Sequence, residues 1–163
     1  MSKPRILAVD IGGPVLMREA GSSPEEYARA RPTPGAFDTL ADVSPRLFEG
    51  RVHLISQCTP EIEAVKREWL IRQEFHEQAR IPPEALHFCR KPEDKARICL
   101  DLGVTDFVDD RAKILSYAIS CVNHLYLFNP NEDELREYNF ILLKAYCVQN
   151  WTDLRAMLEA HAD

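Results

Sequence analysis

Several polar residues of this chain stand directly after short apolar runs. They are Asp10, Ser56 and the adjacent pair Asp109 and Asp110. In an open parallel sheet, ligands bind at the carboxyl ends of the strands, so these side chains are expected to meet at one edge. Carboxylates this close repel one another unless a cation or a proton lies between them. Mg²⁺ is the natural cation, because it takes oxygen ligands and usually keeps waters and a substrate phosphate.

A phosphate group in such a site also needs positive charge and close access to the backbone. Lys91 and Lys95 lie just upstream of the last of these apolar runs, and either can supply the charge. Gly12 and Gly13 follow Asp10 and allow a sharp turn with close approach of a ligand. Together these residues predict phosphoryl-transfer chemistry that depends on a metal ion.

The elements that must position these residues follow from apolar runs that alternate with helical patterns. Strands are predicted at 5–9, 51–55, 86–89, 105–108 and 124–128. Helices are predicted at 34–47, 60–79, 94–102, 111–120, 133–145 and 152–161, with a helix start near 22–26. Strands separated by such helices favour an α/β fold, with a parallel sheet of about five strands in a three-layer α/β/α, Rossmann-like arrangement. No repeat or linker interrupts the pattern, which predicts one domain over 1–163.

Composition narrows the class of protein. The net charge of −6, from 20 basic and 26 acidic side chains, argues against broad binding to nucleic acid, although a local basic patch stays open. The five cysteines are an odd number without a CxxC pair, so a disulfide framework or a zinc site is not expected. The first apolar run is too short for a signal peptide or a membrane span. We therefore expect a soluble, cytoplasmic protein without a membrane partner.

Four segments, in order, resemble the motifs of the haloacid dehalogenase (HAD)-like hydrolase superfamily. Residues 10–16 resemble the first motif, in which an aspartate ends the first strand and a glycine-containing loop follows. Residues 53–56 resemble the second, and 95–111 the third and fourth. The separation from Lys95 to Asp109, 109 − 95 = 14 positions, suits the lysine–helix–strand–acid layout of the family.

The resemblance implies a Mg²⁺-dependent phosphatase. Asp10 would be the nucleophile that forms an aspartyl-phosphate. Ser56 would hydrogen-bond the transferring phosphoryl group, and Lys95, or Lys91 as second choice, would neutralise its charge. The implied metal ligands are Asp10, the backbone carbonyl of Gly12, Asp109 and Asp110.

One position departs from the family pattern. Phosphatases of the family usually carry a second aspartate two positions after the nucleophile, which protonates the leaving group and then activates water; here that position is Gly12. General acid–base catalysis is typically worth ~10²–10⁴-fold. Three interpretations follow: a slow phosphatase, an altered displacement such as dehalogenation, or a binding or regulatory module that has lost activity. His53, His87 or a residue within 17–33 are the candidate substitutes.

Cap domains, which often select the substrate in this family, have no room here. The segments 17–33 and 57–85 hold at most a helix and a turn, so the resemblance implies a capless or minimal-cap member. An open site suits a large phosphorylated substrate, or a partner chain or second copy that covers it.

Overall fold

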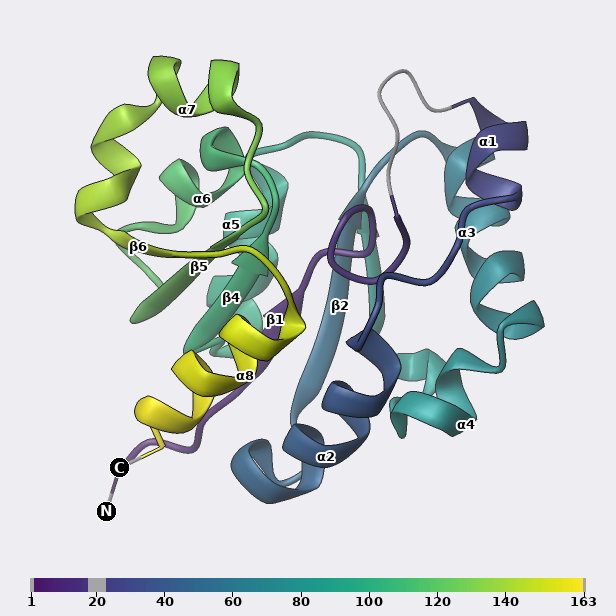
Figure 1. Cartoon of the computed structure of the whole chain (residues 1–163), viewed down its shortest axis with the longest axis horizontal. Coiled ribbons are helices and arrows are strands. Elements are labelled where there is room, and N and C mark those ends of the chain that lie inside the picture. Colours follow the sequence, from purple (N-terminus) through teal and green to yellow (C-terminus); the bar gives the residue numbers. More distant parts are fainter. Residues whose placement is uncertain (1, 18–22, 163) are drawn as a thin grey trace.

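The computed structural model describes residues 2–17 and 23–162, whose strands form a single six-stranded sheet with helices on both faces (Figure 1). The strand order is β3-β2-β1-β4-β5-β6, and every neighbouring pair is parallel. The strands are β1 Leu7–Val9, β2 Val52–Gln57, β3 Leu86–Cys89, β4 Asp106–Asp109, β5 His124–Phe128 and β6 Ala145–Val148.

Eight α-helices and two 3₁₀ segments connect the strands in this part of the chain. The helices are α1 Pro24–Ala28, α2 Ala36–Phe48, α3 Pro60–Arg72, α4 Phe75–Ala79, α5 Asp94–Leu102, α6 Ala112–Ala118, α7 Glu132–Glu137 and α8 Trp151–Ala160. The 3₁₀ segments are η1 Pro83–Ala85 and η2 Asn139–Leu143. Within the described ranges, no helix is long and apolar enough to cross a membrane.

Alternation along the strands divides the core into two layers. Leu7 and Val9 of β1 pack with side chains of α2, α3, α4 and α8, whereas Ala8 packs with α5 and α6 on the opposite face. Because both faces are covered, the central strands are apolar on both sides, as expected for a parallel sheet. The predicted three-layer α/β/α class is therefore confirmed, with six strands where about five were predicted.

Two predicted helices differ in the structure. The predicted helix 133–145 is wrong: α7 ends at Glu137, η2 follows, and Ala145–Val148 pairs with β5 as the edge strand β6. The predicted helix 60–79 is divided into α3 and α4, because Glu74 has a left-handed backbone (φ 54°) that interrupts the helix. The single-domain assignment stays a prediction.

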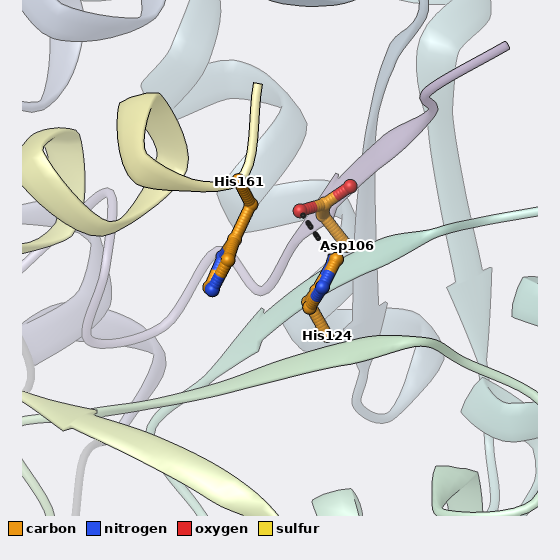
Figure 2. A group of neighbouring side chains, drawn as sticks. All are labelled: Asp106, His124 and His161. Atoms are coloured by element: carbon orange, nitrogen blue, oxygen red, sulfur yellow. Dashed lines mark ion pairs between the residues drawn. The ribbon is translucent and has the colours of Figure 1, made fainter. Parts of the chain in front are cut away.

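At the amino ends of the strands, three polar side chains fasten the last helix to the sheet (Figure 2). One donor atom each of Asp106, His124 and His161 lies within 4.8 Å of the others, a spacing that suggests a metal site. However, the two imidazole rings are stacked, with centroids 4.1 Å apart and planes 4° from parallel. Their in-plane lone pairs therefore do not converge on one ion. Asp106 also accepts hydrogen bonds from Arg5 and Tyr126, both 2.8 Å.

We therefore interpret the cluster of Asp106, His124 and His161 as a set of structural contacts that attach the end of α8 to the sheet, and we call it the clasp. Tyr126 bridges it, because its hydroxyl lies 2.8 Å from Asp106 Oδ1 and 2.8 Å from His161 Nδ1. Burial, followed by the nearby His124, lowers the pKa of His161, while Asp106 opposes that effect. A neutral His161 is thus the form that the folded protein favours.

The clasp predicts a pH dependence of stability. Because the folded state lowers the pKa of His161, the unfolded chain binds this proton more readily, and stability is lost as pH falls through about 6.5. Denaturant unfolding of His161→Gln should lose less free energy of unfolding between about pH 7.5 and 5.5 than the wild type does. Equal losses in the two proteins would contradict this role of His161.

Candidate functional site

The predicted acidic residues meet at the carboxyl edge of the sheet. β1 and β4 are neighbours, with Val9 in register with Val108, so Asp10 and Asp109 follow adjacent strands. The backbone N–H of Asp10 donates to the carbonyl of Val108 at 2.9 Å. One carboxylate oxygen each of Asp10, Asp109 and Asp110 lies within 4.8 Å of the others. The strand order reverses direction at β1 and β4, which is where open α/β sheets place their ligands.

Lys95 joins two of these carboxylates. Its Nζ donates to Asp10 Oδ1 at 2.8 Å and to Asp109 Oδ2 at 2.7 Å. Lys95 is 3% exposed and Asp109 fully buried, so both ion pairs lie out of solvent. Lys91 is exposed. Of the two lysines that the sequence offered, the first turn of α5 brings Lys95 to the acids.

The electrostatics of this group are set by three carboxylates around one ammonium. Burial favours the neutral form of Lys95, but Asp10 and Asp109 outweigh it and raise the pKa of the ammonium. Burial, together with the charge of Asp10, raises the pKa of Asp109 despite its contact with Lys95. Asp110 is the third carboxylate of the group, with one oxygen within 4.8 Å of an oxygen of each of the other two. An all-oxygen donor set of three carboxylates fits a hard divalent cation such as Mg²⁺.

The loop after Asp10 packs closely against the carboxylate of Asp110. Gly13 has φ 103°, and a Cβ there would lie 2.5 Å from Asp110 Oδ2, so only glycine allows this approach. The carbonyl of Gly13 accepts a hydrogen bond from Thr33 Oγ1 at 2.7 Å. The carbonyl of Pro14 accepts one from Trp151 Nε1 at 2.6 Å. The start of α8 and the segment before α2 thereby fix the position of the loop.

Ser56 has a partner that the sequence did not predict. It lies within β2, is fully buried, and accepts a hydrogen bond from Lys66 Nζ at 2.8 Å. Lys66 is only 3% exposed, although charged residues surround it in the sequence of its helix. Its position was a usable signal, because Trp69 and Leu70 stand three and four residues later and share its buried helix face.

A polar hollow lies beside Asp10. Its lining residues come from several segments of the fold: Asp10, Gly12, Tyr27, Gln57, Lys66, Lys95, Arg111 and Ile114. The three predicted residues Asp10, Gly12 and Lys95 therefore share one space, which also contains Lys66. Over this hollow, the expected absence of a cap domain stays a prediction.

The proposed substitutes for the missing acid/base residue differ in position. His53 and His87 hydrogen-bond to each other, with ring nitrogens 3.0 Å apart, and neither lines the hollow. Tyr27, from the segment 17–33, does line it. Residues 18–22 of that segment lie outside the described residues. The geometry therefore gives the histidines no support and leaves Tyr27 beside the site.

Sequence comparison provides no family for this chain. No known protein family matches the sequence. No curated protein matches it either.

Comparison with solved structures, in contrast, finds several phosphatases of similar fold. Similar folds occur in a D,D-heptose 1,7-bisphosphate phosphatase from B. bronchiseptica, complexed with magnesium and phosphate (TM-score 0.66, 14% identity, 96% of this chain and 98% of that one). A D,D-heptose 1,7-bisphosphate phosphatase from Burkholderia thailandensis has a similar fold (TM-score 0.55, 9% identity, 96% of this chain and 99% of that one). The cobalt-bound deoxy-D-mannose-octulosonate 8-phosphate phosphatase of Haemophilus influenzae is similar as well (TM-score 0.55, 11% identity, 96% of this chain and 88% of that one). The chain has the HAD-like fold. The resemblance expected from the motifs is thus confirmed at the level of fold.

The contact between Gly13 and Asp110 predicts a selective effect of substitution at Gly13. Gly13→Ala should displace the Asp110 carboxylate and weaken Mg²⁺ binding, measured by titration calorimetry, by roughly 10-fold or more. Gly50→Ala is the matched control, because Gly50 also has positive φ (78°) but nothing lies within 4 Å of its added Cβ.

Both variants should lose about 1–3 kcal/mol of stability from the strained backbone. Only Gly13→Ala should lose Mg²⁺ affinity. Equal Mg²⁺ affinity in the two variants would show that the Gly13 contact does not shape the metal site.

Proposed function

We propose that this HAD-like protein is a Mg²⁺-dependent phosphatase that acts through an aspartyl-phosphate on Asp10. The observation that carries the proposal is the buried ammonium of Lys95, held between Asp10 and Asp109 at the carboxyl edge of β1 and β4. The magnesium, cobalt and phosphate named for the structural neighbours support the same class of chemistry.

The metal would be held by Asp10, Asp109, Asp110 and the backbone carbonyl of Gly12. When bound, Mg²⁺ would supply positive charge that stabilises the transferring phosphoryl group beside the carboxylates. Lys95 contributes the nearest fixed positive charge, and its raised pKa keeps it an ammonium. Ser56 would donate a hydrogen bond to a phosphoryl oxygen.

The reaction would proceed in two displacements. A carboxylate oxygen of Asp10 forms a bond to phosphorus, and the bond between phosphorus and the ester oxygen breaks, with its electron pair leaving on that oxygen. Water then attacks phosphorus, the bond to Asp10 breaks, and inorganic phosphate leaves as the carboxylate is restored. The sum is ester plus water to alcohol plus phosphate.

Gly12 limits this chemistry. No side chain stands at that position to protonate the departing oxygen or to activate water. Esters whose leaving group needs little protonation, such as aryl phosphates, should therefore be the best substrates. A cytoplasmic location, a large natural substrate and a partner chain over the site stay predictions.

The nucleophile is tested directly by substitution. Wild-type protein should hydrolyse p-nitrophenyl phosphate only with Mg²⁺, and Asp10→Asn should lower kcat by roughly 10³-fold or more, because a carboxamide is a poor nucleophile. Asp101→Asn, at an exposed position of α5, is the matched control and should keep full activity. Mg²⁺-dependent hydrolysis that survives in Asp10→Asn would remove Asp10 from this role.

Gly12 also favours a second candidate, a HAD-like binding or regulatory module without turnover. Such a protein would be inactive on a broad panel of phosphate esters yet still bind Mg²⁺ or a protein partner.

Restoring the acid separates the two functions. Among the described glycines, positive φ occurs at Gly13, Gly35, Gly50 and Gly103, so the backbone at Gly12 accepts an aspartate. If the remaining site is competent, Gly12→Asp should raise kcat for aryl phosphates by at least ~10-fold, toward the ~10²–10⁴-fold of a general acid–base group. An unchanged rate, with the fold intact by circular dichroism, would favour the binding module.

A further inference from the structure

A second buried lysine lies beside the proposed phosphoryl site. Lys66 is on α3, whose apolar residues Trp69 and Leu70 belong to the core layer of α2 and α8. Lys95 is on α5, which packs in the layer on the opposite face of the sheet. The two ammonium groups therefore approach the same hollow from opposite faces.

The hydrogen bond between Lys66 and Ser56 has a fixed direction. An ammonium group has three donors and no acceptor, so the oxygen of Ser56 must accept from Lys66 at 2.8 Å. The hydrogen of Ser56 must then be donated to some other group. The sulfur of Cys58 lies within reach of this hydroxyl, but sulfur is a weak acceptor. A charged phosphoryl oxygen is a stronger acceptor than this sulfur and would therefore accept the hydrogen of Ser56 in its place.

Lys66 also contacts an aromatic ring. Its Nζ lies 5.0 Å from the centre of the Tyr27 ring, within the range of a cation–π contact. Both Lys66 and Ser56 are almost fully buried, and a buried charge is retained only where it is paired and hydrogen-bonded. These contacts therefore hold the Lys66 ammonium where it donates to Ser56.

We propose that Lys66 is a positioning residue for phosphoryl recognition: it holds the oxygen of Ser56 so that the Ser56 hydroxyl donates into the site. This inference rests on the proposed phosphatase function. It adds a charged group from α3 to a site where α5 supplies Lys95 and where Arg111 also lines the hollow.

The test is a double-mutant cycle on p-nitrophenyl phosphate hydrolysis. Ser56→Ala and Lys66→Met should each lower kcat/KM by roughly 10- to 100-fold, the size expected for a hydrogen bond to a charged group. The double variant should lose little more than either single one, because both remove the same interaction. Lys66→Gln keeps a neutral donor and should recover part of the rate. Lys144→Met, at an exposed lysine, is the matched control.

Thermal unfolding of each variant separates this role from a structural one. If Lys66→Met lowers the Tm but leaves kcat/KM of the folded protein unchanged, the inference is overturned. It is also overturned if the losses of Ser56→Ala and Lys66→Met multiply in the double variant, because the two groups then act independently.

A separate measurement distinguishes failure of the proposed phosphatase function from failure of the role of Lys66. If the wild type shows no hydrolysis that depends on Asp10, the phosphatase proposal fails. The same variants are then titrated with inorganic phosphate in the presence of Mg²⁺. A shared, non-additive loss of affinity supports the positioning role, whereas a wild type that binds no phosphate, or variants that bind it equally well, overturns it.

Discussion

The contact of one buried ammonium with two buried carboxylates is the interaction on which the site depends. Lys95 can reach Asp10 and Asp109 only because β1 and β4 are neighbours and α5 begins beside their carboxyl ends. Breaking a buried ion pair by removing one partner typically costs about 3–5 kcal/mol, since the other charge stays buried and unpaired. The same three groups thus organise the sheet edge and give the site its charge.

The remaining features of the site follow from the need to hold further charge at this edge. Gly13 lets the loop after β1 approach Asp110, and Trp151 fixes that loop through the carbonyl of Pro14. Lys66 supplies a second ammonium from α3 and directs it at Ser56. The opposite edge is different in kind, because Asp106 is already satisfied by Arg5 and Tyr126. The carboxyl edge thus gathers three carboxylates around Lys95, whereas Asp106 at the amino edge is paired within the fold.

The sequence predicted those parts of the fold in which local pattern and tertiary structure agree. Strands 86–89 and 124–128 and helix 94–102 have the predicted bounds, because apolar runs and the Gly103 stop mark them clearly. β6 was missed, since two of its four residues, Tyr146 and Cys147, are exposed and no burial pattern distinguishes it. Lys66 was missed because a charge on a charged helix resembles solvent-facing surface, although Trp69 and Leu70 mark the buried helix face on which it lies.

The most direct measurement is a crystal structure of the protein with Mg²⁺ and fluoroberyllate, a mimic of the aspartyl-phosphate. The account predicts one Mg²⁺ bound by the carboxylates of residues 10, 109 and 110, with the beryllium on Asp10 and Lys95 beside it. A metal bound elsewhere, or carboxylates that stay clear of any ion while Lys95 alone neutralises them, would contradict it.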